Sequence, residues 1–274
     1  MSLDLQTAHI SRIGGRRRNE DSCAYWSSDA GCCWVVSDGA GGHGSGDVAS
    51  RLVVNAVIES FSLNPVVSSE NVAKLLEAAQ TAVVDAKQAS PGGDDMYATC
   101  VLLLIDRKSC RAVWGHAGDS RLYLFRAGKL CYQTRDHSLV QNMIDAGYGS
   151  AEMSRTHPNR NLLTSAIGNP GDLEITVSDD ALGLSDGDAF LLCSDGWGEY
   201  VHEDRMVELL DRARPVQAWI EDMAEVVERE ARSGNDNYTA IGVAVANAGN
   251  LETGPVSVVE DEITVLLPSS KAVS

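Results

Sequence analysis

The sequence of 274 residues lacks several features that would assign it to common classes of protein. It contains no run of about 18 apolar residues, so we expect no membrane-spanning helix. Its first twelve residues lack the apolar core of a secretory signal peptide, which makes a cytoplasmic location the expectation. There is no low-complexity segment and no internal repeat of about 20 to 50 residues. The composition that remains is that of an ordinary globular protein.

Basic residues are scarce relative to acidic ones. The chain has 22 lysine and arginine residues against 39 aspartate and glutamate residues, which gives a formal net charge of −17. Nucleic acids and anionic membranes are bound through basic surfaces, so this charge argues against both as partners. The surplus of carboxylates is compatible with solubility alone or with a cluster that binds cations.

The seven cysteines include no Cys-x-x-Cys pair. They are scattered and mostly lie within apolar runs expected to form strands. We therefore predict reduced, buried thiols, and neither a zinc site nor a disulfide framework. Cys193 adjoins one of the acidic motifs described below, and we interpret it as a buried thiol rather than a nucleophile.

Hydrophobic periodicity divides the chain into runs of strands and pairs of helices. Strands are predicted near 3–11, 22–28, 31–37, 97–106, 110–119, 120–133, 172–178, 188–194 and 238–246. Helices are predicted over 47–61, 69–89, 138–147, 203–212 and 215–232. We expect an antiparallel meander between 97 and 133 and an irregular segment at 148–171. This order favours stacked sheets with helices on their outer faces.

The end of the chain differs in character from the rest. We predict one domain over residues 1–246, followed by a linker and tail over 247–274. The apolar and acidic stretch Glu260–Leu267 has three interpretations that stay open. It adds as a strand to a sheet edge, serves as a phospho-acceptor for a partner, or forms a floppy extension.

Residues 34–46, WVVSDGAGGHGSG, are the most informative stretch. The apolar run at 34–36 predicts a buried strand, and the glycines between 39 and 46 predict a turn whose backbone approaches a ligand closely. Asp38 lies at the junction. The glycine spacing also fits the dinucleotide fingerprint, but the preceding Ser-Asp and the antiparallel pattern that follows are wrong for that fold.

Three further aspartates recur at the rim of an apolar run, within two residues of a glycine: Asp119, Asp195 and Asp236. Each of them alone is typical of a turn or cap. Together with Asp38, their matching contexts favour a shared site, in which repulsion between carboxylates would be relieved by a cation. Hard divalent ions of the magnesium or manganese type take such oxygen ligands.

Six motifs follow one another along the chain. They are Arg16-x-x-Asn19-Glu20-Asp21, Asp38-Gly39-Ala40-Gly41-Gly42-His43-x-x-Gly46, Gly118-Asp119-Ser120-Arg121-x-Tyr123, Asp136-His137-Ser138, Ser194-Asp195-Gly196 and Asp236-Asn237-x-Thr239. In this order they resemble the type-2C metal-dependent Ser/Thr protein phosphatases (the PPM family), especially the bacterial branch, over about residues 5–246. The resemblance implies an α+β fold, a four-layer α-β-β-α sandwich in which two central antiparallel sheets are flanked by helix pairs.

The resemblance also implies a binuclear Mn²⁺ or Mg²⁺ centre at one end of the sandwich. Asp38 would bridge the two ions, the Gly39 carbonyl would bind one, and Asp195 and Asp236 would complete the other. Asp119 matches a residue that holds a third ion in bacterial relatives. Three further positions would lie in the surrounding shell, where the acidic ones act largely through metal-bound waters: Glu20, Asp21 and Asn237.

The implied enzyme is a protein-serine/threonine phosphatase. A hydroxide that bridges two ions would attack the phosphoryl group directly, without a phosphoenzyme. Arg16 matches the phosphate-clamping arginine, and its planar fork suits phosphate. Arg17 and Arg18 are interpreted as a solvated basic loop whose charge attracts acidic phosphopeptides. The implied partners are phosphoserine and phosphothreonine proteins, together with a bacterial Ser/Thr kinase whose action the enzyme reverses.

Some family features do not carry over, and one rival function stays open. A histidine proposed as general acid in eukaryotic members is replaced by Ala40, which leaves the proton donor open. His43 is interpreted as a loop-structuring residue, 157–160 as a structural part of a flap over about 138–171, and Trp197 as packing. The alternative function is a weakly active or inactive regulator with the same fold, which loss of a metal-binding aspartate or of Arg16 would favour; neither is lost.

Overall fold

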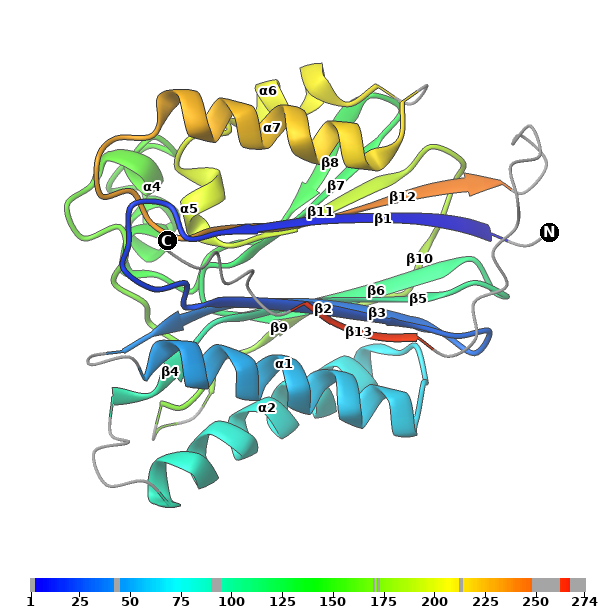
Figure 1. The fold of residues 1–274 in the computed structure, drawn as a ribbon, viewed down its shortest axis with the longest axis horizontal. Helices are drawn as coiled ribbons and strands as arrows, with labels where there is room; N and C mark the ends of the chain where they lie inside the picture. The colour runs from blue at the N-terminus through cyan, green and yellow to red at the C-terminus, as the bar shows by residue number, and fades with distance from the viewer. Residues whose placement is uncertain are drawn as a thin grey trace, which may run out of the picture.

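Two antiparallel sheets are stacked face to face, and helices cover their outer faces (Figure 1). The computed structural model describes residues 3–41, 45–89, 95–169, 171, 173–211, 214–247 and 262–266. The four-layer arrangement confirms the predicted α-β-β-α sandwich. None of the helices in these ranges is both long enough and apolar enough to cross a membrane.

The first sheet has five strands. In spatial order they are β1 (Leu3–Arg12), β12 (Tyr238–Asn247), β11 (Ala189–Cys193), β7 (Arg121–Arg126) and β8 (Lys129–Gln133). Its outer face is covered by α5 (Asp195–Gly198), α6 (Glu203–Leu209) and α7 (Val216–Glu230).

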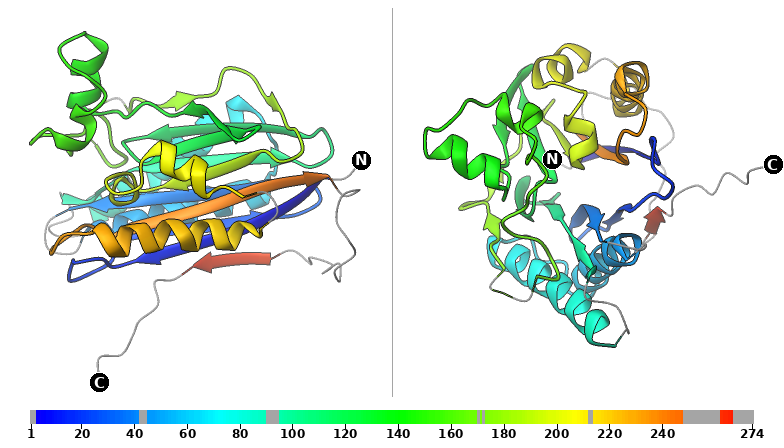
Figure 2. Two further views of the ribbon diagram at one scale, coloured as in Figure 1. Left: turned by 90° about the horizontal axis from the view of Figure 1, so that it is seen from above. Right: turned by 90° about the vertical axis from the view of Figure 1, so that its left-hand side faces the viewer.

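The second sheet has eight strands. Its main path runs through β10 (Leu182–Gly183), β6 (Arg111–Ala117), β5 (Cys100–Asp106), β3 (Cys32–Ala40), β2 (Asp21–Ser27) and β13 (Glu262–Leu266). Two short strands lie off this path, β4 (Tyr97–Ala98) on β3 and β9 (Thr176–Val177) on β6. Helices α1 (Gly46–Leu63) and α2 (Ser69–Ala89) cover its outer face. The remaining helices, α3 (Leu139–Asp145) and α4 (Met153–Thr156), belong to a segment that projects from the sandwich (Figure 2).

Strand β3 is buried on both faces, which explains its continuous apolar run. Trp34 and Val36 pack between the two sheets, whereas Cys33 and Val35 pack against α1 and α2. Burial of a side chain such as that of Val35 or Val36 stabilises the fold by about 1.5–3 kcal/mol. The prediction of a buried strand at 34–36 is confirmed.

Helix α7 shows how the outer layer is attached. Its apolar face, which includes Trp219 and Ile220, packs on the five-stranded sheet, and the Trp219 indole Nε1 donates to the Met206 carbonyl of α6 at 3.0 Å. Gly242 of β12 lies beneath it, where a Cβ would approach Ile220 to 2.9 Å. The helix therefore packs directly on the backbone of the sheet, and the predicted core position of Trp219 is confirmed.

The predicted meander between 97 and 133 is wrong in its connectivity. Strands β5 and β6 pair in the larger sheet, but β7 and β8 pair in the smaller one, so the chain crosses between sheets at Gly118–Ser120. Alternation of apolar residues is the same in either sheet, and the sequence pattern therefore does not reveal the crossing. Gly118 has φ +100°, and a Cβ there would lie 2.7 Å from the Thr99 side chain.

Smaller differences occur at element ends. The predicted strand at 172–178 is reduced to Thr176–Val177 within the described residues, and the segment expected to be irregular contains α4. Helix α6 ends at Leu209, before the predicted 212. Short helices and two-residue strands have little periodicity, which is why the pattern misses them.

The cysteines are free thiols, as predicted. Five of them are buried, and Cys110 is partly buried. Cys131 is exposed, so the prediction of burial does not hold for it.

Part of the tail is a strand. β13 pairs antiparallel with β2, from Glu262 opposite Ser27 to Leu266 opposite Cys23. Of the three interpretations of the tail, strand addition is therefore the one seen for residues 262–266. The domain boundary at residue 246 stays a prediction.

Candidate metal centre

The strand ends that carry the acidic motifs gather at one end of the sandwich. Asp21, at the start of β2, lies opposite Asp38 near the end of β3. In the other sheet, β11 ends at Cys193, opposite Arg121 at the start of β7 and Ala240 near the start of β12. Asp195 and Asp236, which flank β11 and β12, thus lie near one another, and the charges of both act on Asp38 at the end of β3. Helix α5, which begins at Asp195, lies at the left in Figure 1.

The predicted carboxylates lie close enough to change one another's ionisation. Burial raises the pKa of Asp38 well above its ordinary value. The neighbouring charges raise it further, in the order Asp21, Asp195, Asp119 and Asp236. Burial and the Asp236 charge raise the pKa of Asp195, and a hydrogen bond to Asp38 opposes this shift. The structure therefore brings together the four aspartates expected to bind metal.

Asp21 is the most deeply buried of these groups, with 1% of its surface exposed. Burial raises its pKa to about 7, although a hydrogen bond from Ser194 opposes the shift. The Ser194 hydroxyl donates to Asp21 Oδ2 at 2.8 Å and accepts from the Thr239 amide at 3.0 Å. Ser194 thus holds Asp21 of one sheet against the other sheet.

Two buried carboxylate oxygens of the cluster have no hydrogen-bond partner in the part of the chain that the structure describes. They are Asp21 Oδ1 and Asp195 Oδ1. A buried anionic oxygen without a partner is costly unless a proton or a cation neutralises it. The donor set, which consists of carboxylate oxygens, is the one that Mg²⁺ and Mn²⁺ prefer.

The side chains are not, however, positioned to coordinate a metal ion. Across the described ranges, no group of three or more His, Cys, Asp or Glu side chains has the geometry to hold an ion. Arg16 Nη2 contacts Asp236 Oδ2 at 2.6 Å, so this carboxylate is engaged by a guanidinium. The residues fit divalent ions in their chemistry, and binding would require the carboxylates to draw together.

The backbone at Asp38 is tied to the crossover that carries Asp119. The Asp38 amide donates to Thr99 Oγ1 at 2.9 Å, and the Thr99 amide donates back to the Asp38 carbonyl at 2.8 Å. A hydrogen bond of 2.6 Å joins the hydroxyls of Thr99 and Ser120. Burial and the Asp195 charge raise the pKa of Asp119, so this residue is electrostatically part of the cluster.

Gly39 allows the end of β3 to touch the start of α1. A Cβ on Gly39 would lie 2.0 Å from the Gly46 carbonyl oxygen, and one on Gly46 would lie 2.7 Å from the Gly39 oxygen. The Gly39 amide donates to the Glu20 carbonyl at 3.1 Å. Glycine is thus required on steric grounds at both positions. The metal-binding role of the Gly39 carbonyl stays a prediction, and His43 lies outside the described residues.

Asn237 organises the arginine loop. Its Oδ1 accepts from the Glu20 amide at 2.8 Å, and its Nδ2 donates to the carbonyls of Ile13 and Arg18, both at 2.8 Å. The buried amide is therefore occupied by the backbone of the loop. This clamp is absent from the sequence prediction, which placed Asn237 only in the shell around the metals.

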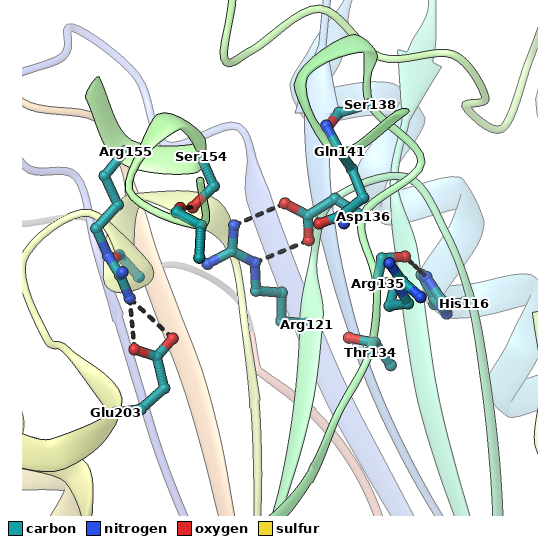
Figure 3. A network of polar contacts seen from close by, with 12 residues as sticks. His116, Arg121, Thr134, Arg135, Asp136, Ser138, Gln141, Ser154, Arg155 and Glu203 are labelled. Carbon is teal, nitrogen blue, oxygen red and sulfur yellow. Dashed lines mark hydrogen bonds and ion pairs between the residues drawn. The ribbon is translucent and has the colours of Figure 1, made fainter. Parts of the chain in front are cut away.

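The start of the flap is anchored beside the carboxylates (Figure 3). Arg121 Nε donates to Asp136 Oδ1 at 2.8 Å and Arg121 Nη2 to Asp136 Oδ2 at 2.6 Å, with each side chain only 9% exposed. A Cβ on Gly198 would lie 3.0 Å from Arg121 Nη1, so the guanidinium packs beneath α5, the helix that begins at Asp195. This buried pair connects β7, the flap and the cluster.

Two flap arginines reach the segment that follows Asp195. Arg155 Nη2 donates to both carboxylate oxygens of Glu203, at 2.8 and 2.6 Å (Figure 3). Arg160 Nη2 contacts Glu199 Oε2 at 3.3 Å. In the flap itself, His157 Nδ1 accepts from the Asn159 amide at 3.1 Å, which agrees with a structural role for residues 157–160. The flap is therefore held against the helices that continue from the cluster.

The structure identifies one acidic neighbour that sequence reasoning missed. Asp47, in the first turn of α1, has a buried Oδ1 without a partner among the described residues. Its charge contributes to raising the pKa of Glu20, after the larger effect of burial. Its position directly after the glycine-rich turn was the available signal in the sequence.

Trp197 is fully buried, as the packing interpretation predicted.

The metal-free protein should lose stability as pH rises. The folded-state pKa of Asp21 is about 7 against an ordinary value of 3.8, so the folded state binds this proton more tightly than the unfolded state. The associated stability is complete below about pH 4 and is lost as pH rises through about 7. We expect the Tm of chelated protein to fall by at least about 4 °C between pH 5 and pH 8.

Thermal denaturation across this pH range, with and without the Asp21→Asn substitution, measures the effect. The substitution removes one of the titrating groups and should flatten part of the dependence. A Tm that is constant or rises with pH in the chelated protein would contradict the assignment.

Known proteins are similar to this chain in sequence and in architecture. A family model described as protein phosphatase 2C matches residues 9–236. The Ser/Thr phosphatase PstP of Mycobacterium tuberculosis is 30% identical over 280 aligned positions, which cover 99% of this chain and 52% of PstP. The chain thus spans about half the length of that relative. The Ser/Thr phosphatase Stp of Listeria monocytogenes is 30% identical over 234 positions, which cover 82% of this chain and 90% of Stp.

Solved structures agree with this relationship. The crystal structure of M. tuberculosis PstP/Ppp superposes with a TM-score of 0.76 at 30% identity, covering 89% of this chain and 99% of that one. The PstP catalytic domain in complex with two manganese ions gives a TM-score of 0.74 at 28% identity, covering 90% and 100%. The chain, with its two stacked sheets and its carboxylate cluster, belongs to the protein phosphatase 2C family.

Proposed function

We propose that this protein is a metal-dependent phosphatase that hydrolyses phosphoserine and phosphothreonine in proteins. The observation that supports it most is the convergence of Asp38, Asp119, Asp195 and Asp236 at one end of the sandwich, next to Arg16. Family membership supports the same reaction, and the PstP catalytic domain was solved with two manganese ions. The opposed action of a bacterial Ser/Thr kinase is part of the proposal.

Each residue of the cluster has a defined task in this reaction. Asp38, the Gly39 carbonyl, Asp195 and Asp236 would hold two Mn²⁺ or Mg²⁺ ions, and Asp119 would help to hold a third. When bound, such ions supply a nucleophilic water near neutral pH and offset charge on the phosphoryl oxygens. Ser194, the Thr99 hydroxyl and the β2–β3 pairing keep the carboxylates in place on the protein side.

Arg16 would bind the substrate phosphoryl group. Its guanidinium already lies at the rim of the cluster, 2.6 Å from Asp236, and its side chain is 53% exposed. A planar fork with several N–H donors can grip two phosphoryl oxygens at once, and little covalent chemistry is then left to the protein. The shift of Arg16 from Asp236 to substrate would couple phosphate binding to the release of a carboxylate for a cation.

Hydrolysis of p-nitrophenyl phosphate and a phosphothreonine peptide tests this function. We expect activity with Mn²⁺, at least a tenfold loss after chelation (about 1.4 kcal/mol in the barrier) and recovery when Mn²⁺ is restored. Metal content should be measured on the same samples. Full activity in protein shown to be free of metal would refute the mechanism. Phosphopeptide binding without hydrolysis under Mn²⁺ and Mg²⁺ would instead favour the binding-regulator alternative.

A further inference from the structure

A basic hollow lies at the edge of the carboxylate cluster of this acidic protein. It measures about 590 Å³ and is lined by Gly15, Arg16, Arg17, Arg18, Glu20, Gly234, Asp236 and Asn237. Three consecutive arginines thus face one space, although the chain as a whole carries a net charge of −17. Two carboxylates, Glu20 and Asp236, also line the hollow, and Asp236 is paired with Arg16. The arginines still outnumber these carboxylates, and charges farther than about 10 Å away are screened by salt, so the hollow attracts anions.

The loop that carries these arginines is held firmly in position. Gly14 adopts φ +58°, and the Gly15 amide donates to the Asn235 carbonyl at 3.0 Å. Asn237 grips both sides of the loop, as described above, and the Asn19 side chain donates to Ser11 Oγ at 2.8 Å. The arginine backbone positions are therefore fixed relative to Asp236.

The three arginines differ in what they contact. Arg16 is paired with Asp236 at 2.6 Å. In contrast, Arg17 and Arg18 make no ion pair and no side-chain hydrogen bond with any described residue, although the Arg18 charge lowers the pKa of the half-buried Glu20. Both side chains are exposed. Two guanidinium groups are thus free to pair with an external anion.

Because Arg17 and Arg18 are adjacent to Arg16, an anion bound to them would lie within a few residues of the phosphoresidue. Arg17 and Arg18 directly follow the arginine assigned to the phosphoryl group, and successive residues of an extended peptide are spaced by roughly 3.3 Å. A peptide whose phosphoresidue meets Arg16 would therefore place its neighbouring side chains at the same hollow. The planar fork of a guanidinium group matches the oxygens of a carboxylate and those of a phosphate, so either anion can pair with Arg17 and Arg18.

We propose that Arg17 and Arg18 form a second anion subsite, which makes the protein select phosphopeptides that carry another anionic group within a few residues of the phosphoresidue. The inference rests on the proposed phosphatase function and adds a substrate class to it. A small substrate such as p-nitrophenyl phosphate has no group to place in this subsite.

Four phosphothreonine peptides of equal length test the subsite. They carry alanine, glutamate, lysine or a second phosphoserine beside the phosphothreonine, and kcat/KM is measured for each with wild-type enzyme and Mn²⁺. We expect the glutamate peptide to exceed the alanine peptide by about five- to tenfold, mainly through KM, and the lysine peptide to be the poorest. The preference should shrink as salt is raised.

Two double substitutions make the test specific to the loop. Arg17→Ala with Arg18→Ala should reduce the ratio between glutamate and alanine peptides to about one, and Arg17→Glu with Arg18→Glu should invert it in favour of the lysine peptide. Arg205→Ala with Arg229→Ala is the matched control, because it removes two exposed arginines of α6 and α7. The control should retain the wild-type ratio.

The outcomes separate this inference from the proposed function. If wild-type enzyme hydrolyses neither p-nitrophenyl phosphate nor any peptide, the proposed function fails. If it hydrolyses all peptides with equal kcat/KM, or if the alanine double variant keeps the preference, the subsite is refuted. Preference for both the glutamate and the bis-phosphorylated peptide supports a general anion subsite, and preference for the latter alone supports one selective for phosphate.

Discussion

Asp38→Asn is expected to lower kcat/KM for p-nitrophenyl phosphate by at least about 100-fold, which corresponds to about 2.7 kcal/mol of transition-state stabilisation. Asp38 is the carboxylate at the centre of the cluster, where four other aspartates act on its ionisation. An amide cannot supply the negative charge that two cations share. The steady-state rate and the bound Mn²⁺ per chain, measured on the same preparation, should fall together.

The Asp38→Asn protein should nevertheless fold at least as well as wild type without metal. Burial raises the pKa of Asp38, so a neutral amide removes a group that the folded state accommodates poorly as an anion. Asp106→Asn is a matched control, because Asp106 is the last residue of β5, at the opposite end of that strand from Cys100. Near-normal activity of Asp38→Asn with unchanged metal content would rule out a bridging role.

Arg121→Leu is expected to destabilise the protein by about 3–5 kcal/mol. The substitution leaves the Asp136 carboxylate buried without its partner, since both side chains are 9% exposed in the intact pair. For a protein of this size the loss corresponds to a decrease in Tm of roughly 10 °C. Chemical or thermal denaturation at neutral pH with excess Mn²⁺ measures it.

Two further variants distinguish the effect of an unpaired buried charge from the effect of losing any ion pair. Arg121→Met combined with Asp136→Leu removes both charges and should be more stable than either single substitution, because no unpaired ion stays buried. Arg205→Leu breaks an exposed pair with Glu208 and should change stability by less than about 1 kcal/mol. A Tm within 2 °C of wild type for Arg121→Leu, against the roughly 10 °C expected, would show that the pair does not hold the flap base.

Periodicity was sufficient to predict the local elements but not their partners. The helix at 69–89 and the buried strand at 34–36 follow from side-chain spacing alone. The assignment of β6 and β7 to different sheets does not follow from it, because both strands are buried along nearly their whole length. The chain passes from one sheet to the other at the turn around Gly118. Glycine is needed there because a Cβ would collide with the Thr99 side chain, which is distant in the sequence.

The carboxylate cluster could be predicted because its members share a local context. Asp38, Asp195 and Asp236 each lie at the rim of an apolar strand, and antiparallel pairing brings such rims together. The Arg121–Asp136 pair and the three side-chain hydrogen bonds of Asn237 join residues that are distant in the sequence, so no local pattern predicts them. Periodic patterns indicate which residues are buried, but they do not indicate which polar groups form hydrogen bonds with one another.

Because the cluster spans the two sheets, metal binding there would depend on how the whole sandwich is packed. Asp21 and Asp38 belong to the larger sheet, whereas Asp195 and Asp236 flank strands of the smaller one. Ions bound between them would cross-link the sheets and stabilise the fold by mass action. By the same linkage, the substitution Phe190→Ala in the apolar layer between the sheets should weaken metal affinity, because it changes how closely the sheets approach each other.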